Sequence, residues 1–578
     1  MKIKILFLLF LMLLSLSKIT EAQYLHSNGK YIVDGDDQEF IMRGMGFGGW
    51  MLQEGYMLGT GHFAPTQHEI RALMVASMGN ARTNDFYKAW LANHCTKTDI
   101  DSLASWGFNA VRLPMHYNLF TLPIEDEPVA GKDTWLEDGF KMVDQLIDWC
   151  QANHMYVILD MHATPGGQGK NASISDYDPG KPSLWESKEN QRKLVTLWQK
   201  LAKRYANEKY VGGYDLINET NWSFTGENPN GCDSRNEPLR NLMIRLTKAI
   251  REVDQNHLIF VEGNCWANNW DDLFPKWDDN IAYSFHKYWN KTDKNTIQKF
   301  LDFRDQYNVP VWMGESGENS NQWFYETIHM LEEQRVGWSW WPLKKIGSIV
   351  CPLTAIQTPE YDQLLESWKN GETPDPDFCY QTLMQIADNL KIENCLYHPD
   401  LIDAMFRQQS EATSIPFKKL VVPGVIHAVD FDMGRYDVAY HDADYMNDNN
   451  HGRWNRGHQY RNDGVDIEKC SDHSIFSNNY NVSWIEPGEW MVYTVEVKES
   501  GNYQITFRVA NNEGGGQFHL EIDQKNVTGA VVVEAAGGDQ QWKDVVVRNV
   551  PIKAGKHQLK FYAEQGGFKL NYFRFEKE

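Results

Sequence analysis

One repeating pattern between residues 41 and 341 constrains the fold of this 578-residue chain more than any other feature. Short apolar runs recur there, separated by stretches whose apolar residues have helical spacing, such as Phe140, Val143 and Ile147. Eight runs have the length and composition of strands: residues 41–47, 110–114, 157–161, 214–217, 258–262, 282–286, 311–313 and 337–341. Eight strands that alternate with helices predict an α/β fold, a closed (β/α)8 or TIM barrel with its helices outside. The connection over residues 51–98 is too long for a plain loop, which predicts inserted structure over the barrel mouth.

After residue 410 the spacing of apolar residues changes. Residues 411–423 contain two prolines and no periodicity, which predicts a linker over 411–422. Short alternating runs follow, for example residues 490–497 and 503–509, with a turn over 499–502 between them. This alternation is typical of an antiparallel β-sandwich. We therefore predict a barrel domain over 23–410 and a C-terminal sandwich of jelly-roll type over 423–578.

The N-terminus has the pattern of a secretory signal peptide. Lys2 and Lys4 precede an apolar run over residues 5–16, and small residues follow as far as Ala22. We predict a signal peptide over 1–22 and a secreted or periplasmic protein; the alternative is a short membrane anchor. The apolar run is shorter than the roughly 20 residues that a spanning helix needs, and no later segment predicts a membrane span. The eight cysteines are too sparse for a disulfide scaffold, and their spacing does not select a pairing.

Charge and aromatic content indicate the class of partner. The net charge of −22 disfavours a nucleic acid, because a polyanion is repelled by an acidic surface. The chain has 22 Trp, 26 Tyr and 27 Phe residues, and aromatic faces stack on flat apolar surfaces such as those of sugar rings. A neutral oligosaccharide or polysaccharide is the expected partner, and the oligomeric state stays open.

Polar side chains follow the predicted strands at the barrel end where functional groups gather. Arg112, His162, Glu219, His286 and Glu315 all stand at or just past a strand. A single Glu at such a place is more often a solvated loop residue. Two of them, Glu219 and Glu315, are predicted to face each other across the mouth, as glycoside cleavage requires. One carboxyl protonates the departing oxygen and the other meets the cationic sugar carbon.

Six motifs in this order resemble glycoside hydrolase family 5, the cellulase-type family. The motifs are residues 110–114, 158–162, 217–219, 284–288, 313–317 and 337–341. Two further runs, 43–50 and 160–168, are most similar to the β-1,3-glucanase branch of that family. The resemblance covers about 300 residues and implies the same barrel fold that the periodicity predicts.

The resemblance also implies roles for single residues. It makes Glu219 the acid/base and Glu315 the nucleophile of a retaining β-glycosidase. It implies that Asn218 contacts the sugar 2-hydroxyl and that Tyr288 donates a hydrogen bond to the nucleophile. Arg112 and His162 would orient the two carboxylates. His286 would line the cleft, and Trp341 would form the platform on which the cleaved sugar stacks. The family usually has Pro after the acid/base, and here Thr220 stands there. Asn218, Glu219 and Thr220 also match a glycosylation acceptor, a reading that burial in the cleft disfavours.

The resemblance implies hydrolysis of a β-glucan, β-1,3 or β-1,4 linked, with no cofactor and no metal. Alternatives are a β-mannan, xylan-type or glycolipid hydrolase, or a noncatalytic glycan-binding surface protein. Internal and terminal attack both stay open. Five tryptophans that follow strands four to seven are candidate sugar platforms or, equally, wall residues: Trp222, Trp266, Trp270, Trp289 and Trp323.

The C-terminal region resembles a family 6 carbohydrate-binding module through residues 463–468, 481–484, 487–490, 509–511 and 566–571. Trp484 matches the first ligand-gripping aromatic residue of that family, whereas Asp539 and Lys569 stand where a second aromatic and an Asn are usual. His427 and Val429 replace two calcium-binding glutamates, so no metal is predicted. The acidic residues Asp442, Asp444 and Asp448 are interpreted as a solvated loop; the alternative is a calcium site. The module is predicted either to bind glycan or to pack on the barrel.

Overall fold

The computed structural model describes residues 23–228, 231–288, 290–445 and 455–578. The predicted signal peptide lies outside these residues. Eight parallel strands close into a barrel, which confirms the predicted TIM barrel. In barrel order they are β3 (Arg43–Gly46), β4 (Ala110–His116), β5 (Tyr156–Ala163), β6 (Val211–Asp215), β7 (Ile259–Glu262), β8 (Ile281–Lys287), β9 (Val311–Gly317) and β10 (Gly337–Trp341).

The fourth barrel strand, β6, begins and ends earlier than the sequence predicts. Gly212 and Gly213 interrupt its apolar pattern, so its first half has no strand signal. A Cβ at Gly213 would lie 2.7 Å from the carbonyl oxygen of Leu258, so only glycine lets the neighbouring chain come this close. The strand therefore starts at Val211 and ends at Asp215.

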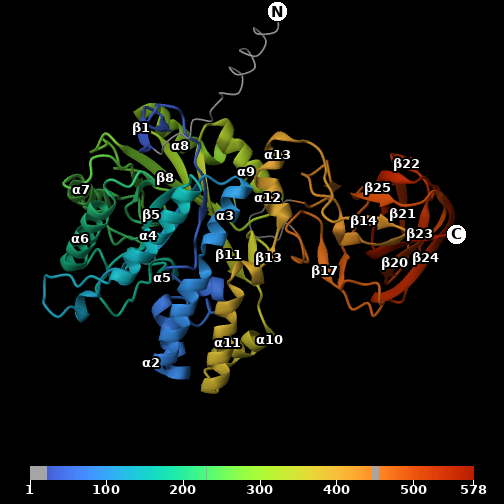
Figure 1. The fold of residues 1–578 in the computed structure, drawn as a ribbon, viewed down its shortest axis with the longest axis horizontal. Helices are drawn as coiled ribbons and strands as arrows, with labels where there is room; N and C mark the ends of the chain where they lie inside the picture. The colour runs from blue at the N-terminus through green and yellow to red at the C-terminus, as the bar shows by residue number, and fades with distance from the viewer. Residues whose placement is uncertain (1–22, 229–230, 289, 446–454) are drawn as a thin grey trace, which may run out of the picture.

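Helices surround the barrel, as Figure 1 shows. They are α3 (Lys97–Trp106), α4 (Glu137–Ala152), α6 (Lys188–Tyr205), α7 (Glu237–Arg251), α8 (Gln298–Tyr307) and α9 (Asn321–Glu333). Each presents one apolar face inward; Leu146, Leu197 and Leu246, for example, are fully buried against the strands. Burial of each such side chain contributes roughly 1.5 to 3 kcal/mol of the driving force. The connection between β7 and β8, described throughout, contains no helix.

The long connection after β3 forms inserted structure, as predicted. It contains the 3-10 helix η1 (Gly55–Leu58) and helix α2 (Gln67–His94), whose first turn is closed by reciprocal bonds between Thr66 and Glu69. Helix α2 lies against α11 (Pro376–Asn389), and the pair projects from the barrel (Figure 1). Helix α10 (Pro359–Lys369) completes this unit, and Trp341 of β10 belongs to its apolar core. The insertion therefore joins directly to the barrel mouth.

One disulfide links the loops that follow β6 and β7, between Cys232 and Cys265. The other six cysteines are free thiols. No described helix is both long enough and apolar enough to cross a membrane.

The C-terminal domain is a sandwich of two largely antiparallel sheets, which confirms the second predicted fold class. One sheet contains β14 (Leu420–Val422), β19 (Trp490–Val497), β25 (Gly555–Gln565), β21 (Gly516–Ile522) and β22 (Lys525–Asn526), joined by β16 (Tyr440–His441) and β23 (Val531–Val533). The other contains β17 (Ile467–Lys469), β18 (Tyr480–Val482), β26 (Lys569–Lys577), β20 (Gly501–Asn511) and β24 (Gly538–Ile552), joined by β15 (Gly424–His427). Strand β14 lies within the segment that the sequence predicts as linker and pairs in parallel with β19. Helices α12 (Pro399–Met405) and α13 (Arg407–Ser410) lead into the sandwich (Figure 1).

Candidate active site

A cleft of about 690 Å³ opens at the carboxyl ends of the barrel strands. Six of the eight residues to which the sequence assigns a role in the barrel site line this cleft, and the other two are buried beneath it. The cleft also contains residues for which the sequence predicted no role. The predicted residues in its lining are His162, Glu219, His286, Tyr288, Glu315 and Trp341. The additional ones include Glu54, Tyr56 and Glu318. Arg112 and Asn218 are buried directly beneath.

The structure brings Glu219 and Glu315 together. Glu219 follows β6 and Glu315 lies in β9, and both side chains are almost buried. One oxygen of each carboxyl and one ring nitrogen of His286 all lie within 4.8 Å of one another. The two acids therefore face the same small volume, in which a single sugar carbon and its oxygen fit.

Glu219 is held by two groups, one on β7 and one on β8. Its backbone adopts a left-handed conformation with φ 39°, and its N–H donates to Glu262 Oε2 at 2.7 Å. His286 Nδ1 lies 2.6 Å from Glu219 Oε1, and the other ring nitrogen lies 3.0 Å from Glu262 Oε1. Glu262 was not among the predicted site residues, although it stands at the end of a predicted strand, where site residues gather. Glu262 fixes both the backbone of Glu219 and the ring that contacts its side chain.

Burial and charge act in opposite directions on the Glu219 and His286 pair. Burial by itself raises the pKa of Glu219, but the hydrogen bond and charge of His286 hold that pKa below its usual value. Burial lowers the pKa of His286, yet the carboxylates of Glu262, Glu315 and Glu219 raise it well above its usual value. A proton is therefore retained within this pair, at the site from which a departing oxygen would receive it.

Arg112 provides the positive charge beneath the cleft. Its Nη1 donates to Glu315 Oε2 at 2.7 Å, and its Nη2 donates to Asn218 Oδ1 at 2.8 Å. The guanidinium also lies 3.0 Å from Asp215, and within 3.3 Å of Asp160 and Glu262. These contacts compensate buried carboxylates that would be costly without a partner. Burial and the charge of Glu262 nevertheless raise the pKa of Asp215 to about 7, against the effect of Arg112.

Tyr288 holds the second oxygen of Glu315. Its hydroxyl donates to Glu315 Oε1 at 2.6 Å. Burial, followed by the charge of Glu315, raises the pKa of Tyr288 well above its usual value, so the hydroxyl keeps its proton. Each oxygen of Glu315 thus accepts one bond, from Tyr288 or from Arg112, and the carboxylate is fixed in orientation.

His162 and Trp341 also line the cleft. Their rings stack at 5.2 Å with an angle of 7° between planes. His162 Nδ1 lies 2.7 Å from Asp160 Oδ2; burial lowers the pKa of His162, and Asp160 more than reverses this effect. Trp341 Nε1 donates to the hydroxyl of Tyr56 at 2.9 Å. Trp341 thus presents a flat indole face that the inserted segment after β3 supports.

A third acid, Glu54, also lines the cleft and was not among the predicted site residues. It lies in the inserted segment after β3 and is 4% exposed. Burial raises its pKa to about 8; His162 opposes this shift, and the charges of Glu315 and Glu219 add to it. Glu54 is therefore neutral at neutral pH and can donate as well as accept a hydrogen bond. Glu54 does not stand at the end of a predicted strand, so the strand pattern in the sequence provided no reason to select it.

The five candidate tryptophan platforms have different positions. Trp266 is 38% exposed and lines the cleft. Trp222 is almost buried and lines a separate pocket, where the ammonium of Lys170 lies 4.2 Å from its ring centre. Trp270 and Trp323 are buried wall residues, and Trp289 lies outside the described residues.

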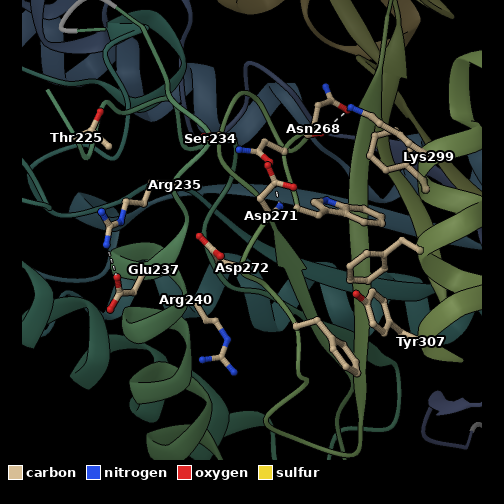
Figure 2. Close-up of a pocket in the computed structure, with 15 residues that line it drawn as sticks. Thr225, Ser234, Arg235, Glu237, Arg240, Asn268, Asp271, Asp272, Lys299 and Tyr307 are labelled. Carbon is tan, nitrogen blue, oxygen red and sulfur yellow. Dashed lines mark hydrogen bonds and ion pairs between the residues drawn. The ribbon is translucent and has the colours of Figure 1, made fainter. Parts of the chain in front are cut away.

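A larger groove of about 1190 Å³ adjoins the cleft (Figure 2). It lies on the outer barrel surface where the β7–β8 connection has no helix. Asn268 and Lys299, joined by a 2.8 Å bond from the ammonium to the Asn268 carbonyl, line both hollows. The acids of the groove are exposed, and Glu237 pairs with Arg235 at 2.9 Å. The smaller cleft, which alone of the two holds buried opposed carboxylates among its described lining, is therefore the candidate active site.

The predicted site residues of the sandwich have separate surroundings and exposures. Trp484 is 40% exposed, and Asp539 is exposed as well. Lys569 pairs with Glu468 at 2.7 Å. His427 lies 3.4 Å from Asp430 and 3.0 Å from the Phe476 carbonyl.

The acidic residues of the sandwich differ in exposure. Asp442 is buried, which corrects its interpretation as a solvated loop residue; Asp444 is half-buried and Asp448 lies outside the described residues. Within the part of the chain that the structure describes, the acids and histidines with metal-ligand spacing are those of the catalytic cleft.

Two family models match the chain. Residues 74–346 match the cellulase model, glycosyl hydrolase family 5, and residues 458–577 match the carbohydrate binding module of family 6. The first match spans the barrel strands β4 to β10 and the second spans most of the sandwich.

Three similar proteins carry names of glycan-cleaving enzymes. The beta-xylosidase of Phanerodontia chrysosporium is 28% identical over 365 residues, which cover 56% of this chain and 71% of the relative. Endoglucanase C of Acetivibrio thermocellus is 26% identical over 323 residues, 45% of this chain and 87% of the relative. A probable glucan 1,3-beta-glucosidase A of Aspergillus niger is 27% identical over 192 residues, 32% of this chain and 42% of the relative.

Replacement of Glu54 by Gln tests the buried neutral acid. Burial raises the pKa of Glu54 from its unfolded value of 4.5 to about 8. Because the unfolded chain loses this proton at a lower pH than the folded protein does, the free energy of unfolding falls as the pH rises through this range. We expect Glu54→Gln to remove this cost, on the order of 1.4 kcal/mol per pKa unit, so that its Tm rises relative to the native protein between pH 5 and pH 9. The measurement is thermal unfolding at both pH values. A Tm difference that does not change with pH would contradict the assignment.

Proposed function

We propose that this chain, which carries a glycoside hydrolase family 5 catalytic domain and a family 6 carbohydrate-binding module, hydrolyses a β-glucan by a retaining double displacement. The observation that carries the proposal is the approach of one oxygen each of Glu219 and Glu315 to within 4.8 Å. Retaining enzymes hold their two carboxyls about 5 to 5.5 Å apart, whereas inverting enzymes leave about 6.5 to 9.5 Å for a water molecule.

In the first step Glu315 attacks the anomeric carbon of the sugar. The bond from that carbon to the glycosidic oxygen breaks, and the oxygen takes the proton that the Glu219 and His286 pair retains. A covalent sugar ester on Glu315 results. In the second step Glu219 accepts a proton from water, the water oxygen bonds to the anomeric carbon, and Glu315 leaves as a carboxylate.

The surroundings of the two acids suit these unequal roles. Arg112 and Tyr288 donate to Glu315, which supports a carboxylate that is charged and oriented for attack. Trp341 presents its indole face beside His162, where the sugar that is cleaved would stack. Asn218 lies beneath and is oriented by Arg112, a position from which its amide can reach a hydroxyl of that sugar.

Xylan is the second candidate substrate, because the first relative named above is a β-xylosidase that matches 56% of this chain. A β-glucan is favoured because the motifs of the sequence and the other two relatives concern glucan-cleaving enzymes. The groove that adjoins the cleft provides space for a polymer that continues past Asn268 and Lys299, on the side of Trp266.

We also propose that the protein is exported. The predicted signal peptide and the disulfide between Cys232 and Cys265 support this proposal, because disulfides persist in oxidising compartments.

Replacement of Glu315 by Gln tests the nucleophile. The change is nearly isosteric but removes the attacking charge, so we expect kcat to fall by about a thousandfold or more. Release of reducing sugar is measured on β-1,3- and β-1,4-glucan, xylan, mannan and aryl β-glycosides. Thermal unfolding serves as the fold control. Activity near that of the native enzyme would reassign the nucleophile, and no cleavage of any of these substrates by the native enzyme would exclude the proposed function.

Replacement of Glu219 by Ala tests the acid. Glycosides with a poor leaving group need the proton, whereas activated aryl glycosides need little of it. We expect kcat/KM on the polysaccharide to fall about a hundredfold more than the rate of the first step on a dinitrophenyl glycoside. Equal losses on the two substrates would contradict the acid role of Glu219.

We propose that the module binds glycan through the face that carries Trp484. This is the most exposed tryptophan among the described residues, and an exposed indole is a stacking surface for sugars. In the full-length Glu315→Gln background, Trp484→Ala should reduce retardation on a glucan affinity gel about tenfold. Val532→Ala, at an exposed valine of β23, is the matched control. Unchanged retardation of the Trp484 variant would mean that another face binds.

A further inference from the structure

The sandwich packs against the barrel at the start of α9, beside α12 and α13 (Figure 1). Arg435 and Tyr436 of the sandwich contact Tyr325 and Gln322 of α9. Nearer the active site, the sandwich contributes residues 461–463, which we call the docking loop. They contact residues 319–321 of the barrel, which begin two residues after the strand that carries Glu315. Asn462 and Asn321, one from each side, are at most 1% exposed.

Hydrogen bonds connect the two sides through the backbone. Asn462 Nδ2 donates to the carbonyl of Asn319 at 2.7 Å and lies 3.2 Å from Asn321 Oδ1. In return the N–H of Asn321 donates to the carbonyl of Asn462 at 2.9 Å. This N–H belongs to the first residue of α9 and has no partner within the helix, so the docking loop satisfies it.

A second layer of polar contacts supports the first. Asn321 Nδ2 donates to Asp400 Oδ2 at 2.7 Å and lies 3.2 Å from Asp463 Oδ1. Asp463 pairs with Arg461 at 2.7 Å, and the guanidinium of Arg461 lies 3.7 Å from the ring centre of Phe431. All of these polar side chains are buried, so loss of one partner would leave a buried polar group without its hydrogen bond.

The segment held in this way is also a wall of the cleft. Gly317 has φ 146°, and a Cβ there would lie 2.1 Å from the carbonyl oxygen of Trp341, so the turn at this point requires glycine. Glu318 follows with φ 51° and lines the cleft. It pairs with Lys345, whose ammonium lies 4.4 Å from the ring centre of Tyr56, the residue that supports Trp341.

We propose that the docking loop of the module is a structural part of the active site. By holding residues 319–321 it fixes the turn after Glu315, and through Glu318 and Lys345 it fixes the wall that includes Tyr56 and Trp341. Asn462 is the positioning residue on the module side. The inference rests on the proposed function. It predicts that the module affects kcat on small glycosides, an effect that binding of the module to polysaccharide cannot explain.

The test uses full-length Asn462→Ala and a small aryl β-glycoside that the native enzyme cleaves. We expect kcat to fall about tenfold with KM changed less than about twofold, because a displaced wall misplaces the sugar. Retardation on the glucan affinity gel should stay unchanged. Tyr325→Phe is the matched control: it removes the hydroxyl that Arg435 contacts at the same interface, away from residues 319–321, and should retain native kcat. Native kcat for Asn462→Ala would overturn the inference.

A double-mutant cycle with Lys345→Met tests whether the effect of Asn462 on the cleft wall passes through Glu318 and Lys345. If Asn462 acts through Glu318 and Lys345, the double variant should lose much less than the product of the two single losses. Losses that simply multiply would overturn this route.

Hydrogen exchange gives a readout that does not require activity. Amides of residues 316–321 should exchange at least about tenfold faster in Asn462→Ala than in Tyr325→Phe, and equal exchange would also overturn the inference. If Asn462→Ala does not fold, Asn462→Ser, which keeps a hydroxyl donor, takes its place. Inactivity of the native enzyme on every glycoside excludes the proposed function instead, and the exchange experiment then decides the inference alone.

Discussion

The buried guanidinium of Arg112 is the interaction on which the site depends. Five acidic groups, Asp160, Asp215, Glu219, Glu262 and Glu315, are gathered in the mouth of one barrel, and all are buried. Without a fixed counter-charge such a group of carboxylates would take up protons and lose its distinct roles. Arg112 contacts four of the five, and the ring of His286 contacts the remaining one, Glu219. The barrel strands hold both positive groups, so the charge pattern is rigid.

Three parts of the chain, distant in sequence, build the walls around this charged centre. The inserted segment after β3 provides Glu54 and Tyr56, the end of β9 and the loop after β6 provide the acid pair, and β10 provides Trp341. The described lining of the cleft contains no residue of the sandwich, but the docking loop holds the turn that continues the strand of Glu315. The fold thus gives the second domain a contact close to the chemistry, in addition to the exposed face that carries Trp484.

The sequence was sufficient to predict the barrel, the sandwich and the opposed acids, because each of these has a local signature. The spacing of apolar residues and the lengths of the strands indicate the fold. In a barrel, the carboxyl ends of the strands lie at the face where functional residues gather. Glu54, Asp215 and Glu262 were not predicted, since their roles come from contacts with other strands. Asn321 and Asn462 appear in the sequence as ordinary polar residues, whereas in the structure both are buried where the two domains meet. The Cys232 and Cys265 pairing and the inward-facing Trp222 likewise follow from spatial neighbours.

The measurement that tests the central claim most directly is the anomeric configuration of the first sugar released. Proton NMR on a β-linked substrate resolves the α and β forms before they interconvert. Two displacements at one carbon return the original configuration, so the account predicts that the β form appears first and the α form grows in later by mutarotation. An α product at the earliest times would mean direct attack by water, and it would contradict the assignment of Glu315 as the group that bonds to the sugar.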